Sequence, residues 1–261
     1  MLTLLRGILF RWQPLCATFA GMASVDLDSD RMIVLSSTVY GDDSHIVRVF
    51  SRTLGVIPLW VRMGKARRAR GEGAKFHALA LLDARGVHRK GSEGLFRVRT
   101  AERAVRLDAM TREARRAAVA FFLAEFLWKT FPEEAPHPEV VDWTWNWVIA
   151  LDATPHPASV HVRYLAGLTA LLGLAPDGIP PSDRHGLQLA TGEYLPIDHP
   201  DDAHLSPAAT RIYLDLVAGE EVQVVGAQRR ELVLGLVRFV QLHLSGERTI
   251  QSYEVLEAVF R

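Results

Sequence analysis

One short segment of the chain contains six cationic residues, and their types and spacing are suited to binding an anionic ligand. Between positions 62 and 75, six of fourteen residues are Lys or Arg, with three glycines among them. Glycine lets a backbone approach a ligand closely, and the cations are suited to phosphate oxygens. Such a loop is typical of proteins that bind nucleic-acid strands without reading their sequence. The cations are Arg62, Lys65, Arg67, Arg68, Arg70 and Lys75.

A second basic surface is predicted about thirty residues later. Arg97 and Arg99 alternate with Phe96 and Val98, which is the pattern of a half-buried strand with a basic outer face. We expect both arginines to extend the nucleic-acid surface. Binding of strands also uses exposed aromatic rings on which bases stack, and Trp60 is the favoured candidate because it precedes Arg62 by two positions. The other aromatic residues near the predicted strands are Tyr40, Phe50, Phe76 and Phe96, and at least half of the five must be core.

The elements that must position these side chains change type along the chain. Short segments rich in Val, Ile, Leu and aromatic residues, separated by Gly, Asp and Ser, predict strands at 33–40, 45–51, 57–62, 77–84 and 95–100. Helical periodicity follows, at 111–131, 138–151, 157–172, 207–217, 227–244 and 251–260. Five short strands in about 70 residues favour a small closed barrel, for which the OB-fold is the common solution. We therefore predict an α+β protein: a five-stranded OB-fold β-barrel over 32–107 and a C-terminal α-helical domain over 108–261, with 1–31 an extension outside the fold.

Charge is divided between the two predicted domains. The net charge of the 261 residues is zero, but residues 31–118 carry 19 Lys and Arg against 8 Asp and Glu, whereas residues 119–261 carry 9 against 19. Such asymmetry favours a polyanion as the partner of the basic half. The acidic half would repel DNA and is better suited to binding protein. An alternative is a scaffold in which the two halves simply neutralise each other.

Composition excludes several function classes, and for several others the sequence contains no characteristic motif. No apolar run reaches the roughly 18–20 residues that span a bilayer, so we expect no membrane association. The single cysteine, Cys16, excludes a disulfide framework and a thiolate-rich zinc site within one chain. No P-loop, G-x-S-x-G, H-E-x-x-H or dinucleotide-binding motif is present, so we expect no catalytic residues, cofactor, metal or small-molecule substrate. The enzyme alternative is a metal site at 198–204 that uses His199 and His204.

Several segments together resemble the RecO family of bacterial recombination mediators, in the same order and over about residues 32–260. They are MIVL (32–35), YGDDSHIV (40–47), FSRTLG (50–55), GKARR (64–68), FFLAEFL (121–127), YLAGLTALLGLAP (164–176), Arg230, FVQLHL (239–244) and IQSYEVL (250–256).

The resemblance implies an N-terminal OB-fold, a C-terminal helical domain and a cytoplasmic, nucleoid-associated protein. It also implies binding of single- and double-stranded DNA, annealing of complementary strands, and a complex with RecR that helps load RecA onto strands coated by single-strand-binding protein (SSB). Many family members hold zinc with four cysteines before the late helices, but 177–205 contains no cysteine. We expect apolar contacts of Leu187 and Leu189 to order that region instead. An RNA- or ribosome-binding OB protein remains an alternative, because phosphate contacts alone do not distinguish the two nucleic acids.

Overall fold

The N-terminal part of the chain forms a closed β-barrel. The computed structural model describes residues 26–64, 71–89, 94–196, 203–244 and 248–260. The strands and the 3-10 helix of the barrel are β1 (Asp26–Leu27), β2 (Asp30–Tyr40), β3 (Ser44–Ser51), β4 (Gly55–Arg62), η1 (Glu72–Phe76), β5 (Leu81–Arg89) and β6 (Phe96–Arg103). The strand order is β1-β5-β2-β3-β4-β6, and a further β5–β6 pairing closes the sheet. Five long strands closed in this way confirm the predicted OB-like barrel.

Two details of the barrel differ from the sequence-based expectations. The fourth predicted strand, at 77–84, is wrong in position, because residues 72–76 form η1 and β5 begins only at Leu81. Between them the chain turns through Leu79, which has a positive φ of 58°. The barrel also begins before residue 32: Asp30 is buried and accepts a hydrogen bond from Ser51, and Leu27 pairs with Val87.

The rest of the chain is mainly helical, as predicted. The helices are α2 (Asp108–Arg112), α3 (Ala114–Thr130), α4 (Pro138–Ala153), η3 (Pro157–Ser159), α5 (Val160–Leu171), α6 (Pro207–Val217), α7 (Gly226–Leu244) and α8 (Ser252–Val259). The predicted first helix is interrupted at Glu113, whose backbone is extended. Ser206 caps α6 through a bond from the Ala209 amide at 3.2 Å. Within the described residues, no helix is long and apolar enough to cross a membrane.

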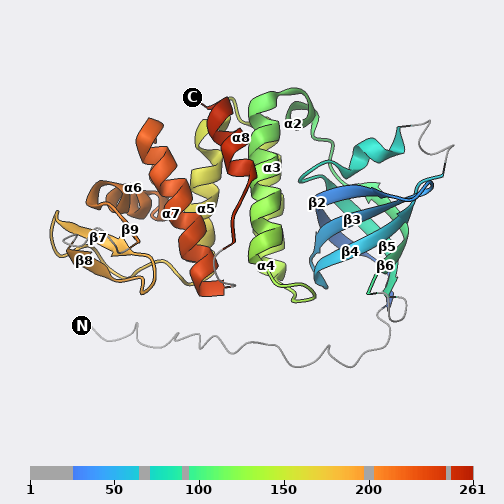
Figure 1. The fold of residues 1–261 in the computed structure, drawn as a ribbon, viewed down its shortest axis with the longest axis horizontal. Helices are drawn as coiled ribbons and strands as arrows, with labels where there is room; N and C mark the ends of the chain where they lie inside the picture. Colours follow the sequence, from blue (N-terminus) through green and yellow to red (C-terminus); the bar gives the residue numbers. More distant parts are fainter. Residues whose placement is uncertain (1–25, 65–70, 90–93, 197–202, 245–247, 261) are drawn as a thin grey trace, which may run out of the picture.

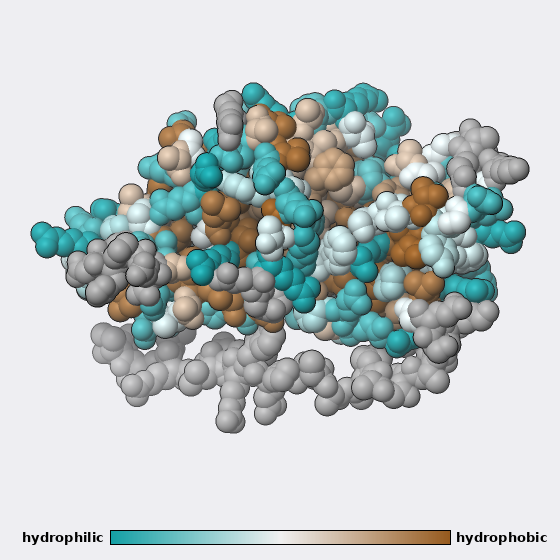
Figure 2. All heavy atoms as spheres, viewed as in Figure 1, coloured by the Kyte–Doolittle hydropathy of each residue, from teal (hydrophilic) through white to brown (hydrophobic). Residues whose placement is uncertain are grey.

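Helix α3 joins the two parts of the molecule. It stands between the barrel and helices α5 to α8 (Figure 1). One cluster of buried residues includes Ile33, Leu35 and Phe50 from the barrel together with Phe122 and Phe126 from α3. A second cluster fills the barrel interior. The barrel therefore packs on the helices through a continuous apolar core, while hydrophilic side chains cover most of the outer face in Figure 2.

Close packing fixes the helices against one another. Gly167 on α5 faces the indole of Trp143 on α4 so closely that a Cβ atom there would lie 2.4 Å from a ring carbon. Glu125 on α3 accepts hydrogen bonds from the Gln251 and Ser252 amides, at 3.1 and 2.7 Å, and so caps α8. The first contact fixes α5 against α4, and the hydrogen bonds of Glu125 fix the start of α8 against α3.

One histidine lies fully inside the helical domain. His161 on α5 packs against the rings of Phe122 and Phe260, and its Nδ1 atom has no hydrogen-bond partner. Burial, and then the nearby Arg229 guanidinium, lower the pKa of His161 to about 3. The side chain is therefore neutral near pH 7 and belongs to the core.

Candidate nucleic-acid interface

The outer surface of β4 and β6 carries an aromatic ring and a cation in direct contact. Trp60 and Arg97 are paired residues of these two parallel strands, so their side chains leave the sheet on the same face. The Arg97 guanidinium lies 5.1 Å from the centre of the Trp60 ring, and both side chains are half-buried. A flat ring held beside a cation is the arrangement on which nucleic-acid bases stack. We call this pair the Trp60–Arg97 platform.

Cross-strand pairing brings further residues onto the same face. Ser44 of β3 pairs with Tyr40 of β2 on one side and with Arg62 of β4 on the other. Because residues two apart on a strand share a face, Arg62 lies beside the platform. Tyr40 is 57% exposed at the end of the β2–β3 hairpin. Sequence alone could not separate Tyr40 from the aromatic residues of the core.

The other three aromatic candidates are core residues. Phe50, Phe76 and Phe96 are all buried, which confirms the expectation that at least half of the five would be. Among the described aromatic side chains of the barrel, Trp60 and Tyr40 are the two on the outer surface.

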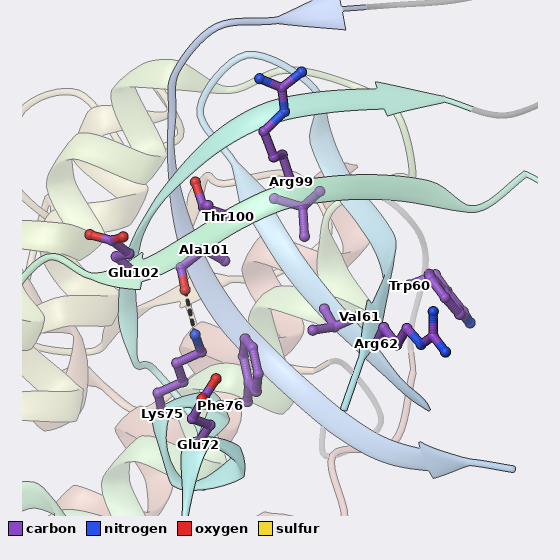
Figure 3. Close-up of a pocket in the computed structure, with 11 residues that line it drawn as sticks. Trp60, Val61, Arg62, Glu72, Lys75, Phe76, Arg99, Thr100, Ala101 and Glu102 are labelled. Atoms are coloured by element: carbon purple, nitrogen blue, oxygen red, sulfur yellow. Dashed lines mark hydrogen bonds between the residues drawn. The ribbon is translucent and has the colours of Figure 1, made fainter. Parts of the chain in front are cut away.

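A cavity of about 300 Å³ opens next to the platform. Strands β4 and β6 pair at only two positions, and beyond Trp60 and Arg97 they separate. Helix η1 packs across the gap, where Lys75 Nζ donates a hydrogen bond to the Ala101 carbonyl at 2.7 Å. Figure 3 shows Lys75 reaching Ala101 beside the Phe76 ring, with Arg62 on the opposite side and the Arg99 guanidinium extending outward.

The predicted binding residues are partly gathered at this cavity. Arg62, Lys75 and Arg99 line it, and Arg97 stands next to it on the platform. The four remaining predicted cations lie outside the described residues: Lys65, Arg67, Arg68 and Arg70. In the sequence they fall between Arg62 and Glu72, and both of these described residues line the cavity.

Three other arginines of the barrel point toward the helical half. We call them the arginine clamp, defined as Arg48, Arg52 and Arg89. Their carboxylate partners are Glu133 at 3.4 Å, Asp142 at 3.0 Å and Glu134 at 2.8 Å, respectively. Part of the charge asymmetry is therefore neutralised within the molecule, as the scaffold alternative proposed. The sequence pattern alone did not distinguish these three arginines from those on the outer face of the barrel.

The clamp is reinforced by packing at the same joint. The Arg48 guanidinium lies 4.4 Å from the centre of the Trp128 ring. Gly55, with φ of +76°, sits where a Cβ atom would lie 2.2 Å from the Ala135 carbonyl oxygen. The chain between α3 and α4 is thus bound closely to the barrel edge.

Comparison with known proteins shows the family of the chain. Family models described as Recombination protein O N terminal and Recombination protein O C terminal match residues 24–104 and 112–178. The chain belongs to the RecO family. It is 26% identical to DNA repair protein RecO of Bacteroides fragilis, over 87% of this chain and 97% of the relative. It is also 26% identical to that of Flavobacterium johnsoniae, over 88% of this chain and 98% of the relative.

The zinc site that the RecO resemblance implies does not fit this chain. The region before α6 forms a small sheet of β7 (His185–Gln188), β8 (Tyr194–Pro196) and β9 (His204–Leu205). No cysteine is present there, and the described residues contain no group of three potential metal ligands. Leu187, Leu189 and Leu205 are buried instead, which confirms the expected apolar contacts. Most of the alternative metal segment at 198–204 lies outside the described residues.

Arg116, in the first turn of α3 of this RecO-family protein, has a structural role. Its side chain is buried and donates hydrogen bonds to the carbonyls of Leu151 and Thr154 and to Glu113. It therefore ties α3 to the end of α4.

Proposed function

We propose that this protein is a non-catalytic DNA-repair and recombination mediator that binds single- and double-stranded DNA on the outer face of its barrel and anneals complementary strands. The observation that carries the proposal is the Trp60–Arg97 platform with Arg62 beside it on one face of an OB-like barrel. Aromatic stacking and phosphate contacts are the two requirements of sequence-tolerant strand binding, and they meet there. The phosphate contacts of the proposal are Arg62, Lys65, Arg67, Arg68, Arg70 and Lys75, with Arg97 and Arg99 secondary.

The annealing step requires no bond-making by the protein. Two strands repel each other through their phosphates, and cations that neutralise both at once lower that repulsion, so complementary bases can meet. The relatives named above are DNA repair proteins by name, which supports DNA as the polyanion.

The acidic helical half is better suited to binding a protein than to binding DNA. Residues 119–261 carry 19 Asp and Glu against 9 Lys and Arg, and this charge would repel DNA. We propose that RecR and SSB are the protein partners, and that the complex with RecR helps RecA load onto SSB-coated single strands in the cytoplasm.

The test is annealing of two complementary labelled oligonucleotides, with and without SSB, over a salt series. We expect acceleration that fades as salt rises and is lost in the double variant Arg67→Glu/Arg68→Glu. Trp60→Ala should slow annealing and weaken single-strand binding. Arg52→Glu, on the clamp, is the matched control and should leave annealing unchanged. Absence of binding at low salt would overturn the proposal, and a preference for structured RNA over DNA strands would favour the RNA-binding alternative.

A further inference from the structure

The lining of the cavity beside the platform has the chemistry of a base-binding site. Part of its lining is apolar and is formed by Val61, Phe76 and Val98. The remaining lining includes both basic and acidic residues, which can donate and accept hydrogen bonds. Phosphate alone would be a poor occupant, because two acidic residues, Glu72 and Glu102, are also among the residues that line the cavity. A nucleobase is planar, apolar on its faces and lined at its edge with both donors and acceptors.

Size and position support the same occupant. A volume of about 300 Å³ is at the small end of ligand pockets, which span about 300–1,000 Å³, and suits a single base better than a whole nucleotide chain. Trp60 and Arg62 are among the lining residues, and both belong to the face where the strand is proposed to run. Cations at the rim can hold the phosphates on either side of the inserted base.

The cavity can offer complementary hydrogen bonds to the edge of a base. Lys75 Nζ donates to the Ala101 carbonyl at 2.7 Å, which fixes a cationic donor group at the wall of the cavity. The Glu72 carboxylate, from the same short helix, supplies an acceptor. Figure 3 shows Glu72 and Lys75 on η1 on the same side of the cavity as the Phe76 ring.

We infer that the cavity between β4 and β6 binds one unpaired nucleobase of the single strand that crosses the barrel. This inference rests on the function proposed above. A base within a duplex would first have to be unstacked and unpaired, which costs a few kcal/mol, so the cavity favours single strands over duplexes. A base held there has to leave before it can pair, and the cavity therefore releases the strand as the complementary strand arrives.

The test combines a filled cavity with DNA that lacks bases. Val98→Phe places a larger ring in the cavity, and Val255→Phe makes the same change on the exposed surface of α8 as a control. Binding is measured for an intact single strand, for a strand of the same phosphate number built from stable abasic spacers, and for a duplex. We expect Val98→Phe to weaken binding of the intact strand about tenfold, which corresponds to about 1.4 kcal/mol. Its affinities for the abasic strand and the duplex should equal those of the wild type, as should its melting temperature.

A second variant distinguishes a base from a phosphate without changing volume. Glu72→Gln should weaken the intact strand alone if a base is bound, with Glu220→Gln on the helical half as the control. Equal tightening of the intact and abasic strands by Glu72→Gln would place a phosphate in the cavity and overturn the inference. The inference would also be overturned if Val98→Phe bound the intact strand with wild-type affinity, or if it lost the same factor of affinity for the intact and the abasic strand. Loss of all DNA binding by the wild type would instead overturn the proposed function.

Discussion

Two sets of arginines on the barrel should respond differently to salt. Arg62 and Arg99 are exposed on the outer face, whereas Arg48 and Arg89 of the clamp are paired with Glu133 and Glu134. For single strands, log affinity falls with log salt by about 0.7 for each phosphate contacted. Replacing both outer arginines by Ala should therefore make the slope shallower by about 1.4, and replacing the two clamp arginines should leave it unchanged.

The size of this effect is large enough to measure. With about six phosphates contacted, the wild-type slope is roughly −4, and affinity falls about 250-fold between 50 and 200 mM salt. The outer-face double variant, with a slope of about −2.6, should lose only about 40-fold over the same range. Fluorescence anisotropy of a labelled single strand gives both values, and thermal unfolding of the same samples reports on stability.

The control is the clamp double variant, Arg48→Ala/Arg89→Ala. It should bind with the wild-type slope while unfolding more readily, because it loses the contact with the Trp128 ring as well as two carboxylate pairs. If the clamp variant changes the slope as much as the outer-face variant does, or if the outer-face variant leaves the slope unchanged, the division of the arginines is refuted.

Three further predictions concern the helical domain. Gly167→Ala should destabilise the protein by about 1–3 kcal/mol, measured by urea unfolding, because the added methyl group meets the Trp143 indole; a smaller loss would mean that the helices can move apart. Burial by itself raises the pKa of Glu125, but hydrogen bonds from Lys129 and from the start of α8 outweigh it and lower this pKa to about 2. The stabilising contribution of the Glu125 carboxylate is therefore complete above about pH 4.5 and is lost as pH falls toward 2. Glu125→Gln should therefore destabilise the protein at pH 7 by about 1 kcal/mol and by progressively less below pH 4.5, in unfolding curves measured across that range. The pKa of His161 is lowered to about 3, so between about pH 6.5 and 3 the unfolded chain binds a proton that the native protein does not. His161→Phe should therefore reduce the loss of stability over this range. An unchanged pH profile would show that the ring titrates at the same pH in the native and the unfolded protein.

Local patterns predicted most elements because each depends on residues near one another in the chain. The alternation around Arg97 and Arg99 identified β6, and helical periodicity over 207–217 identified α6. The strand predicted at 77–84 was misplaced because Phe76 and Leu79 are buried from a 3-10 helix and a turn. Buried apolar residues in such a segment resemble those of a short strand when only their spacing is considered.

The functional surface was harder to predict because it depends on contacts between distant segments. Arg48 and Glu133 are separated by 85 positions, so composition could show that both charges exist but not that they pair. The cavity arises where the pairing of β4 with β6 ends after Trp60, and no local pattern reports where two strands separate. Exposure of Tyr40 likewise follows from the length of the hairpin that carries it.

The continuous core beneath α3 means that the two halves are not independent pieces. Ile33, Leu35 and Phe50 are buried by the same cluster that contains Phe122 and Phe126, so the barrel produced without its helices would present those side chains to water. Such a fragment should associate with itself or bind surfaces indiscriminately. Apparent DNA affinity or partner binding measured on an isolated half would then report on an exposed interior. Activities of this protein are better assigned by point substitutions in the full chain than by cutting it between residues 104 and 112, where the two family models meet.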